Sequence, residues 1–297
     1  MTDGEILRDL PDWDPPADIA AARESWERHA AQFLNRDLPA IGAFHERVNL
    51  GGDLHADIAV PERGARPFPV VLYLHGGGWC FGSPRSFCKV GMTFAANGVL
   101  AVMLDYRLAP EHPFPAALDD MRQAVDWIGR HAAAYGGDGR RITVGGDSAG
   151  GNLALAAALR GPQAFRDRLS ALLLLYGVYD LAAALERANH HPGLVQQVKS
   201  YIGSASIADP LISPKLASLS PSLPPCFLLE GSTDRFVGGE AAALAASLRR
   251  AGMQQELQIV DGMPHGFLQL FQLDGCRTGW RLMLDFLHRQ SRRAAIG

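Results

Sequence analysis

The sequence predicts an α/β fold built on a mostly parallel central β-sheet with helices on both of its faces. Six apolar runs of strand length occur along the chain, at residues 70–75, 98–106, 141–146, 171–177, 225–231 and 256–262. The runs are continuous rather than alternating in polarity, which is typical of strands that are covered on both faces. Helix-like segments separate them, so strand and helix alternate as a parallel sheet requires.

The helical segments follow from apolar periodicity between these runs. The last one, about residues 275–293, places Trp280, Leu284 and Leu287 on one face, as expected for a helix that packs on a sheet. Residues 45–62 have the pattern of a hairpin with Gly-Gly-Asp at its turn, and we expect antiparallel strands at the edge of the sheet. The other expected helices lie at residues 86–98, 116–137, 150–161 and 238–252.

Composition and segment lengths favour one domain over residues 1–297. Hydrophobic residues make up 47% of the chain and charged residues 20%, and no polar or low-complexity tract divides it. Two segments fall outside the alternation of strand and helix, residues 1–44 and about 180–210. Additions of this kind often cover a site, so we predict that both form helical lids, with ordinary surface packing as the alternative.

Charge and composition argue against several kinds of partner. The net charge is −3 and the basic residues are scattered, which does not suit a nucleic-acid surface. The N-terminus lacks the pattern of a secretory signal, and the apolar stretches are too short to span a membrane, so we expect a cytoplasmic protein that does not bind membranes. The four cysteines have no metal-site spacing and are expected to be reduced; no metal and no cofactor is expected.

The stretch GGDSAGGN, residues 145–152, contains the pattern G-x-S-x-G around Ser148. The five-letter pattern is weak evidence by itself, because Gly and Ser are common in this chain. Its context is stronger, since an apolar strand precedes it and an amphipathic helix follows it, which is the setting of a nucleophile elbow. Such a turn is strained, and the residues two before and two after the serine must be small, as Gly146 and Gly150 are.

A serine nucleophile needs a base and an acid partner, and both have candidates downstream. Of the four histidines after Ser148, only His265 follows the final strand and precedes the final helix, at the edge where a parallel sheet places its ligands. The others lie in a predicted lid or inside the last helix. Asp234 follows the strand at 225–231 and is the predicted acid, and Asp180, after the preceding strand, is the alternative.

A run of three glycines follows the first apolar run, in the stretch LYLHGGGWCFG at residues 72–82. Main-chain N–H groups of such a run can converge on the oxyanion that forms when a carbonyl is attacked, and each donor contributes about 3 kcal/mol to transition-state stabilisation. A simple glycine-rich loop is the alternative, which is less favoured because the serine motif follows in the same chain.

Four motifs in this order resemble those of the hormone-sensitive-lipase-like esterases, also called bacterial family IV. They are HGGGW at 75–79, DYRLAPEHPFPAALDD at 105–120, GDSAGGN at 146–152 and DGMPHGF at 261–267, and the resemblance covers about residues 65–290. It implies an alpha/beta-hydrolase fold whose lid combines N-terminal helices with an insertion after the sixth strand. The two irregular segments at 1–44 and about 180–210 have the places that such a lid would occupy.

The resemblance also implies roles for individual residues. Ser148, Asp234 and His265 would form the catalytic triad. The oxyanion donors would be the main-chain N–H groups of Gly77, Gly78 and Ala149, with Gly76 shaping the loop. In the YRLAPE stretch, Tyr106, Arg107 and Glu111 are predicted to have a structural role.

Together these features predict a serine carboxylesterase that forms an acyl-enzyme on Ser148 and needs neither metal nor cofactor. The resemblance implies small-molecule esters with short to medium acyl chains, and a homodimer through the last strand or helix is conceivable on the same ground. Lactonase or amidase activity, such as that of an arylformamidase, is the alternative on the same triad. A non-catalytic small-molecule receptor is a further alternative, against which the presence of His265 argues.

Four aromatic residues are candidates for the wall of a substrate pocket. Trp79 and Phe81 are adjacent to the glycine run, and Trp26 and Phe33 lie in the predicted N-terminal lid. Packing in the core is the equally weighted alternative for each of them.

Overall fold

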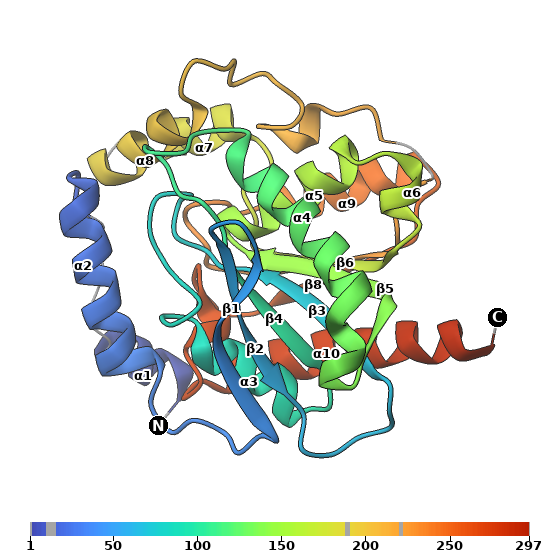
Figure 1. Cartoon of the computed structure of the whole chain (residues 1–297). Coiled ribbons are helices and arrows are strands. Elements are labelled where there is room, and N and C mark those ends of the chain that lie inside the picture. The colour runs from blue at the N-terminus through green and yellow to red at the C-terminus, as the bar shows by residue number, and fades with distance from the viewer. Residues whose placement is uncertain (1, 10–15, 188–190, 220–221, 297) are drawn as a thin grey trace.

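A computed structural model describes the chain apart from residues 1, 10–15, 188–190, 220–221 and 297. Its centre is an eight-stranded sheet in the order β1-β2-β4-β3-β5-β6-β7-β8, in which β3 to β8 run parallel to one another and β2 runs antiparallel to both of its neighbours, β1 and β4 (Figure 1). The predicted α/β fold with a mostly parallel sheet and an edge hairpin is therefore confirmed. The strands are β1 (Ala43–Gly51), β2 (Leu54–Val60), β3 (Phe68–Leu74), β4 (Leu100–Asp105), β5 (Gly137–Asp147), β6 (Leu169–Leu175), β7 (Cys226–Gly231) and β8 (Gln255–Val260).

Helices cover both faces of this sheet. Side chains of α4, α5 and α9 belong to the hydrophobic core on one face, and those of α3 and α10 to the core on the other (Figure 1). No helix in the described ranges is long and apolar enough to cross a membrane. The α-helices are α1 (Asp3–Asp9), α2 (Ile19–His29), α3 (Cys88–Ala96), α4 (Ala116–His131), α5 (Ala149–Arg160), α6 (Gln163–Arg166), α7 (Leu181–Arg187), α8 (Pro192–Ile202), α9 (Glu240–Arg250) and α10 (Asp274–Ile296).

Some helix and strand boundaries differ from those predicted. At these boundaries a glycine with a positive φ angle interrupts the regular backbone. The helix expected over 116–137 ends at His131 and continues as a short 3₁₀ turn, which Gly136 closes at φ +79°. The strand expected from residue 98 begins at Leu100, since Gly98 lies at φ +79° in the turn before it. A left-handed glycine breaks the regular backbone at little steric cost, which fixes these boundaries.

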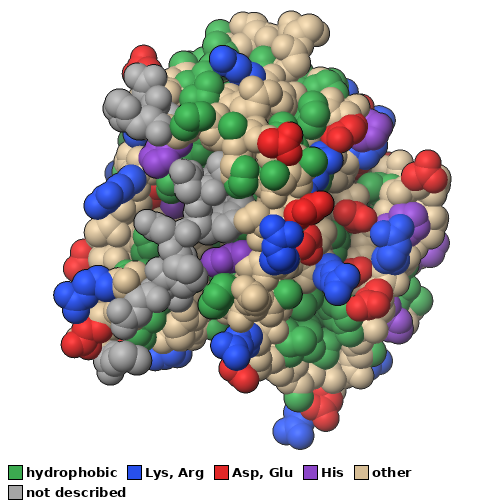
Figure 2. All heavy atoms as spheres, turned by 90° about the vertical axis from the view of Figure 1, so that its left-hand side faces the viewer, with side chains coloured by type: hydrophobic (Ala, Val, Ile, Leu, Met, Phe, Trp, Pro, Cys, Tyr) green, Lys and Arg blue, Asp and Glu red, His purple; other side chains and the backbone are tan. Residues whose placement is uncertain are grey.

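The two segments predicted as lids contain helices that lie outside the regular alternation of strand and helix along the chain. Residues 1–44 form α1, α2 and a five-residue π-helix, Ala30–Leu34, and the insertion between β6 and β7 forms α7 and α8. Residues 1, 10–15 and 188–190 of these segments lie outside the described residues. In Figure 1, α2 lies along one side of the molecule, and α7 and α8 lie at its top. The face that carries α2 mixes acidic, basic and hydrophobic side chains, with no concentration of one charge (Figure 2).

The turn between β5 and α5 leaves no room for side chains at two positions. Ser148 occupies it at φ 53° and ψ −118°, a strained conformation for a residue with a Cβ. A Cβ added to Gly146 would lie 2.1 Å from the carbonyl oxygen of Leu74 in β3, and one added to Gly150 only 1.9 Å from the same atom. These two glycines therefore allow β3, β5 and α5 to meet at the serine.

Replacing one of these glycines by alanine should destabilise the protein strongly. We expect Gly150→Ala to lower the free energy of unfolding by about 3 kcal/mol or more, because the added methyl group overlaps a main-chain carbonyl that cannot move away. Urea denaturation followed by circular dichroism measures the change. Gly4→Ala is the matched control, since a Cβ there meets nothing within 4 Å, and equal stability of the two variants would contradict the steric argument.

Candidate active site

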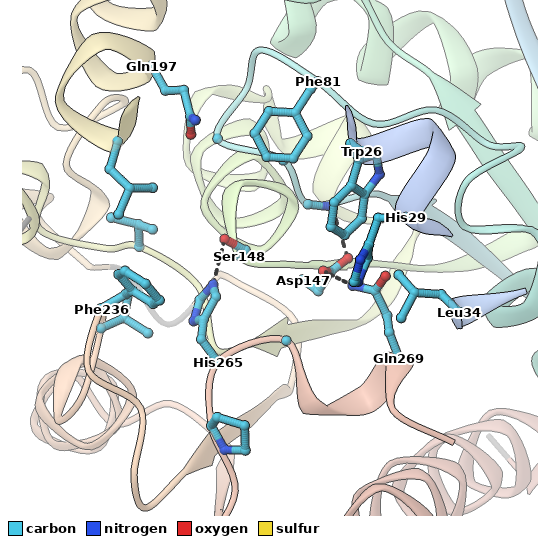
Figure 3. A pocket seen from close by; sticks show the side chains of 18 of the residues that line it. Trp26, His29, Leu34, Phe81, Asp147, Ser148, Gln197, Phe236, His265 and Gln269 are labelled. Carbon is cyan, nitrogen blue, oxygen red and sulfur yellow. Dashed lines mark hydrogen bonds between the residues drawn. The ribbon is translucent and has the colours of Figure 1, made fainter. Parts of the chain in front are cut away.

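Three side chains predicted from the sequence meet where parallel strands end. Ser148 follows β5, Asp234 follows β7 and His265 follows β8. The Nε2 atom of His265 lies 2.9 Å from the hydroxyl oxygen of Ser148, and its Nδ1 atom lies 2.7 Å from a carboxylate oxygen of Asp234. Figure 3 shows His265 pointing at Ser148 across the floor of a cavity. The spacing allows a proton to move from the hydroxyl to the imidazole.

The electrostatics of these groups follow from burial and from their contact with each other. Burial opposes the charged form of His265, but the carboxylate of Asp234 outweighs it and raises the histidine pKa. Burial likewise opposes ionisation of Asp234, yet the charge and hydrogen bond of His265 lower its pKa. The main-chain N–H groups of Phe236 and Val237 donate to the other oxygen of Asp234 at 2.9 and 3.0 Å, which fixes the carboxylate. His265 is thus held in one orientation and its imidazolium form is stabilised.

The alternative acid, Asp180, lies in a different set of contacts. Its carboxylate accepts a hydrogen bond from Lys215 at 3.0 Å and another from the main-chain N–H of Ala183 at 3.1 Å. These contacts hold the start of α7, and they account for Asp180 as a residue that caps a helix.

The glycine run forms a tight loop directly after β3, and Gly77 and Gly78 lie at φ +119° and +54°. Both line the same cavity as Ser148. Within the described residues, the main-chain N–H groups of Gly77, Gly78 and Ala149 donate no hydrogen bond to the protein. The N–H of Gly76 instead donates to Asp147 at 3.0 Å. Three main-chain donors beside Ser148 therefore remain available to a ligand, and Gly76 holds the loop in place.

Asp147 is a residue of this site that the sequence reasoning did not single out. Its buried carboxylate accepts hydrogen bonds from the hydroxyl of Tyr73 at 2.8 Å, from Gly76 and from the side-chain amide of Gln269 at 3.3 Å. Burial raises its pKa to about 6, against the opposing effects of Tyr73, Gly76 and the nearby His265. The sequence could have indicated Asp147, because the residue directly before the serine must lie at the end of the same strand.

A cavity of about 490 Å³ opens above Ser148 and His265. All four aromatic residues predicted for a pocket, Trp26, Phe33, Trp79 and Phe81, line it. The N-terminal segment adds Leu7, His29 and Leu34 to the lining, the insertion adds Ala184, Leu194, Gln197 and Val198, and Phe236 lies opposite Phe81 (Figure 3).

Sequence reasoning missed Gln197 and Phe236 among these residues. Phe236 packs its ring on that of His265, with centroids 5.5 Å apart. It follows Asp234 by two positions, which could have indicated a place at the same strand end. Gln197 lies in the insertion and carries no local signal in the sequence, since only the packing of α8 brings it to the cavity.

The YRLAPE stretch supports the site from outside the cavity. The hydroxyl of Tyr106 donates to the carbonyl oxygen of His75 at 2.8 Å, directly before the glycine run. Arg107 pairs with the buried carboxylate of Asp120, and Glu111 pairs with Arg23 of α2 at 2.7 Å. These contacts agree with the structural role expected for the stretch.

Comparisons with known proteins point to the same class. A family model for the alpha/beta hydrolase fold matches residues 71–269. Carboxylesterase NlhH from Mycobacterium tuberculosis is 35% identical over 214 residues, which cover 67% of this chain and 66% of that relative. The hyperthermophilic esterase from the archaeon Pyrobaculum calidifontis has a TM-score of 0.84 at 26% identity, with 97% of both chains covered. A hormone-sensitive lipase from a metagenome library has a TM-score of 0.79 at 27% identity, covering 96% of this chain and 95% of that one.

The fold and the arrangement at the sheet edge define an alpha/beta hydrolase. Within that class, the chain belongs to the hormone-sensitive-lipase-like esterases, bacterial family IV, as its four motifs indicated. The matched region spans about two thirds of the length of the mycobacterial carboxylesterase.

Removing the charge of Asp147 should lower the pKa of His265. The negative charge of Asp147 helps to raise that pKa, because it favours the imidazolium form. In Asp147→Asn the hydrogen bonds can persist, since the new amide can still accept from Tyr73 and Gly76, and Gln269 can turn its amide oxygen toward the new amide. NMR titration of the imidazole measures the shift.

Asp138→Asn is the control for this titration, because Asp138 is paired with Arg140 on the surface and has no contact with the site. It should leave the pKa of His265 unchanged. An unchanged pKa in Asp147→Asn as well would show that the two groups are not coupled.

Proposed function

We propose that this protein is a serine carboxylesterase, in which Ser148, His265 and Asp234 form the catalytic triad. One observation carries the proposal: the hydroxyl of Ser148, the imidazole of His265 and the carboxylate of Asp234 are joined by contacts of 2.9 and 2.7 Å. The contacts lie beside a loop in which the N–H groups of Gly77 and Gly78 have no partner among the described residues. This combination supplies a nucleophile, a base and an oxyanion site in one cavity.

The reaction takes place in two steps. Ser148 attacks the ester carbonyl while His265 accepts the hydroxyl proton, and the N–H groups of Gly77, Gly78 and Ala149 stabilise the oxyanion. His265 then protonates the leaving alcohol, which leaves an acyl-enzyme on Ser148. Water, deprotonated by His265, attacks that ester, and His265 returns the proton to the oxygen of Ser148 as the acid leaves. Asp234 keeps the imidazole oriented and stabilises its charged form throughout.

The substrates proposed are small-molecule esters with short to medium acyl chains. The cavity of about 490 Å³ suits a ligand of that size, and Trp26, Phe33, Trp79 and Phe81 offer it apolar surface. The names of carboxylesterase NlhH and of the Pyrobaculum esterase state ester hydrolysis and no chain length, so the proposed chain length rests on the cavity and on the family resemblance.

The first test concerns the nucleophile. An active-site-directed phosphonate should label the wild-type protein with a stoichiometry of one, and Ser148→Ala should lose both labelling and ester hydrolysis. Mass spectrometry of the intact protein measures the label.

A wild-type protein that fails to label would favour a receptor, and anilide turnover that matches ester turnover would favour an amidase over an esterase. Preferred turnover of lactones would favour a lactonase.

The second test concerns the acid. Asp234→Asn should lower kcat by orders of magnitude without unfolding the protein, because the neutral amide no longer stabilises the imidazolium form of His265. Asp180→Asn is the matched control and should retain nearly normal kcat, because Asp180 contacts Lys215 and Ala183 and no member of the triad, and the new amide can still accept the N–H of Ala183. Normal activity in Asp234→Asn together with loss in Asp180→Asn would transfer the role to Asp180.

We further propose that residues 1–44 and about 180–210 act as lids on a single domain over 1–297. Arg23 supports this for α2, because its guanidinium donates to the carbonyl oxygen of Cys80 at 2.7 Å and to that of Ala109 at 2.9 Å, and it pairs with Glu111. One side chain thereby joins the N-terminal segment to the glycine loop and to the YRLAPE turn.

Loosening this anchor should weaken substrate binding more than chemistry. Arg23→Ala should raise the KM for a medium-chain ester several-fold and change kcat less, because α2 supplies cavity walls and no member of the triad. Arg28→Ala is the control on the same helix, since Arg28 is exposed and, among the residues that the structure describes, pairs only with Glu24 at 3.5 Å. Equal KM values for the two variants would argue for surface packing in place of a lid.

The proposed location is the cytoplasm, which cell fractionation tests.

The proposed state of association is a homodimer through β8 or α10. The edge position of β8, on which Ile259 is 52% exposed, supports this choice. Light scattering should give twice the chain mass of 32.0 kDa, and the mass of a single chain would contradict it.

A further inference from the structure

Gln197 is a polar side chain buried in a mostly hydrophobic wall of the cavity. It lies on α8, in the insertion, and is only 1% exposed. Neither its amide nitrogen nor its amide oxygen has a hydrogen-bond partner within the described residues. Figure 3 shows the side chain of Gln197 extending from α8 into the cavity, above Ser148 and to the left of Phe81 in this view. A buried amide without partners is costly to the folded state, so the position calls for a ligand that supplies them.

The position of Gln197 relative to the reaction centre is set by Gly78. A Cβ added to Gly78 would lie 2.0 Å from the amide oxygen of Gln197, so the glutamine packs directly on the loop that carries the proposed oxyanion donors. A group bonded close to the scissile carbonyl therefore comes within reach of this amide. Because Gly78 has no side chain, the amide of Gln197 has space to lie against this loop.

Contacts on both sides of Gln197 hold α8 in this position. The carbonyl oxygen of Gln197 accepts a hydrogen bond from the thiol of Cys80 at 3.6 Å. One turn further along α8, Tyr201 stacks on Trp79 with ring centroids 4.5 Å apart and an interplanar angle of 8°. Because α8 is fastened to the glycine loop at both points, the amide is presented by a rigid support.

We propose that Gln197 selects esters that carry a hydrogen-bonding oxygen, such as a hydroxyl, ether or carbonyl, within two or three bonds of the scissile ester group. An amide offers two N–H donors and one acceptor, so it can bind such an oxygen in either orientation. A site that holds unpartnered polar groups discriminates against ligands lacking the complementary group. This proposal rests on the proposed esterase function. It adds which esters the cavity binds best.

The test uses pairs of esters that differ only by exchange of a methylene for an oxygen. On the acyl side these are p-nitrophenyl butyrate and p-nitrophenyl methoxyacetate, and on the alcohol side butyl acetate and 2-methoxyethyl acetate. The alkoxy esters are more reactive in themselves, so the diagnostic quantity is the change, between wild type and Gln197→Leu, in the ratio of kcat/KM within each pair. Release of nitrophenolate or of acid in a pH-stat gives the rates.

In Gln197→Leu, the oxygen-to-methylene ratio should fall about five- to tenfold in at least one pair, which corresponds to about 1 to 1.4 kcal/mol for one hydrogen bond. The kcat/KM for the plain alkyl ester should fall less than that for the oxygen-bearing ester. Thermal stability should stay equal or rise, because the variant no longer buries an unpartnered amide. Gln197→Met, which keeps the length of the side chain, should show the same fall and serves if the leucine variant does not fold.

Gln196→Leu is the matched control, because Gln196 is the neighbouring residue on α8 and is exposed to solvent. It should leave both ratios unchanged. Unchanged ratios in Gln197→Leu would overturn the proposal. An equal loss on every ester would overturn it as well, since it would make Gln197 an oxyanion donor or a structural residue. Failure of the esterase function itself would look different, as the wild type would then hydrolyse neither member of a pair in a Ser148-dependent manner.

Discussion

The active site depends on one steric constraint, the contact of β3, β5 and α5 around Ser148. The carbonyl oxygen of Leu74 lies where a Cβ of Gly146 or Gly150 would have to be. Only glycine satisfies this contact, and the contact in turn forces Ser148 into the left-handed region at φ 53°. The strain is local, while the surrounding sheet is buried and rigid. A strained serine on a rigid support presents its hydroxyl in one direction, which is what His265 requires.

The same contact sets the position of the glycine loop. Leu74 ends β3, so the loop at Gly76–Gly78 begins two residues beyond the point where β3 meets the serine turn. Asp147 then joins the two, because it precedes Ser148 in the chain and accepts the N–H of Gly76. The nucleophile and the proposed oxyanion donors are thus coupled through a single buried carboxylate. Burial raises the pKa of this carboxylate to about 6, although Tyr73 and Gly76 donate hydrogen bonds to it and oppose the shift.

The sequence was informative where function depends on local geometry. A strained turn needs glycines at fixed offsets and parallel strands end at one edge, so Ser148, His265 and Asp234 could be placed by pattern and order. The parallel sheet could also be predicted from the sequence, because strands covered on both faces are continuous apolar runs. Gln197 and the partners of Asp147 could not be found in this way, because a missing hydrogen bond or a buried carboxylate is a property of packing between distant segments. The boundaries set by Gly98 and Gly136 shifted because left-handed glycines override apolar periodicity.

The two parts of the site are built on different supports, and this division explains how chemistry and selectivity are separated. Loops at the ends of the sheet strands carry the triad, whereas α2, α7 and α8 supply much of the cavity wall. The supports are nevertheless joined: Arg187 of α7 donates to the carbonyl oxygen of Phe236 at 2.9 Å and pairs with the buried Glu240. Phe236 packs on His265 and its N–H fixes Asp234. A change in α7 can therefore reach the triad acid through two residues, whereas Gln197 on α8 contacts no member of the triad and, under the selectivity proposed above, acts on what the cavity binds.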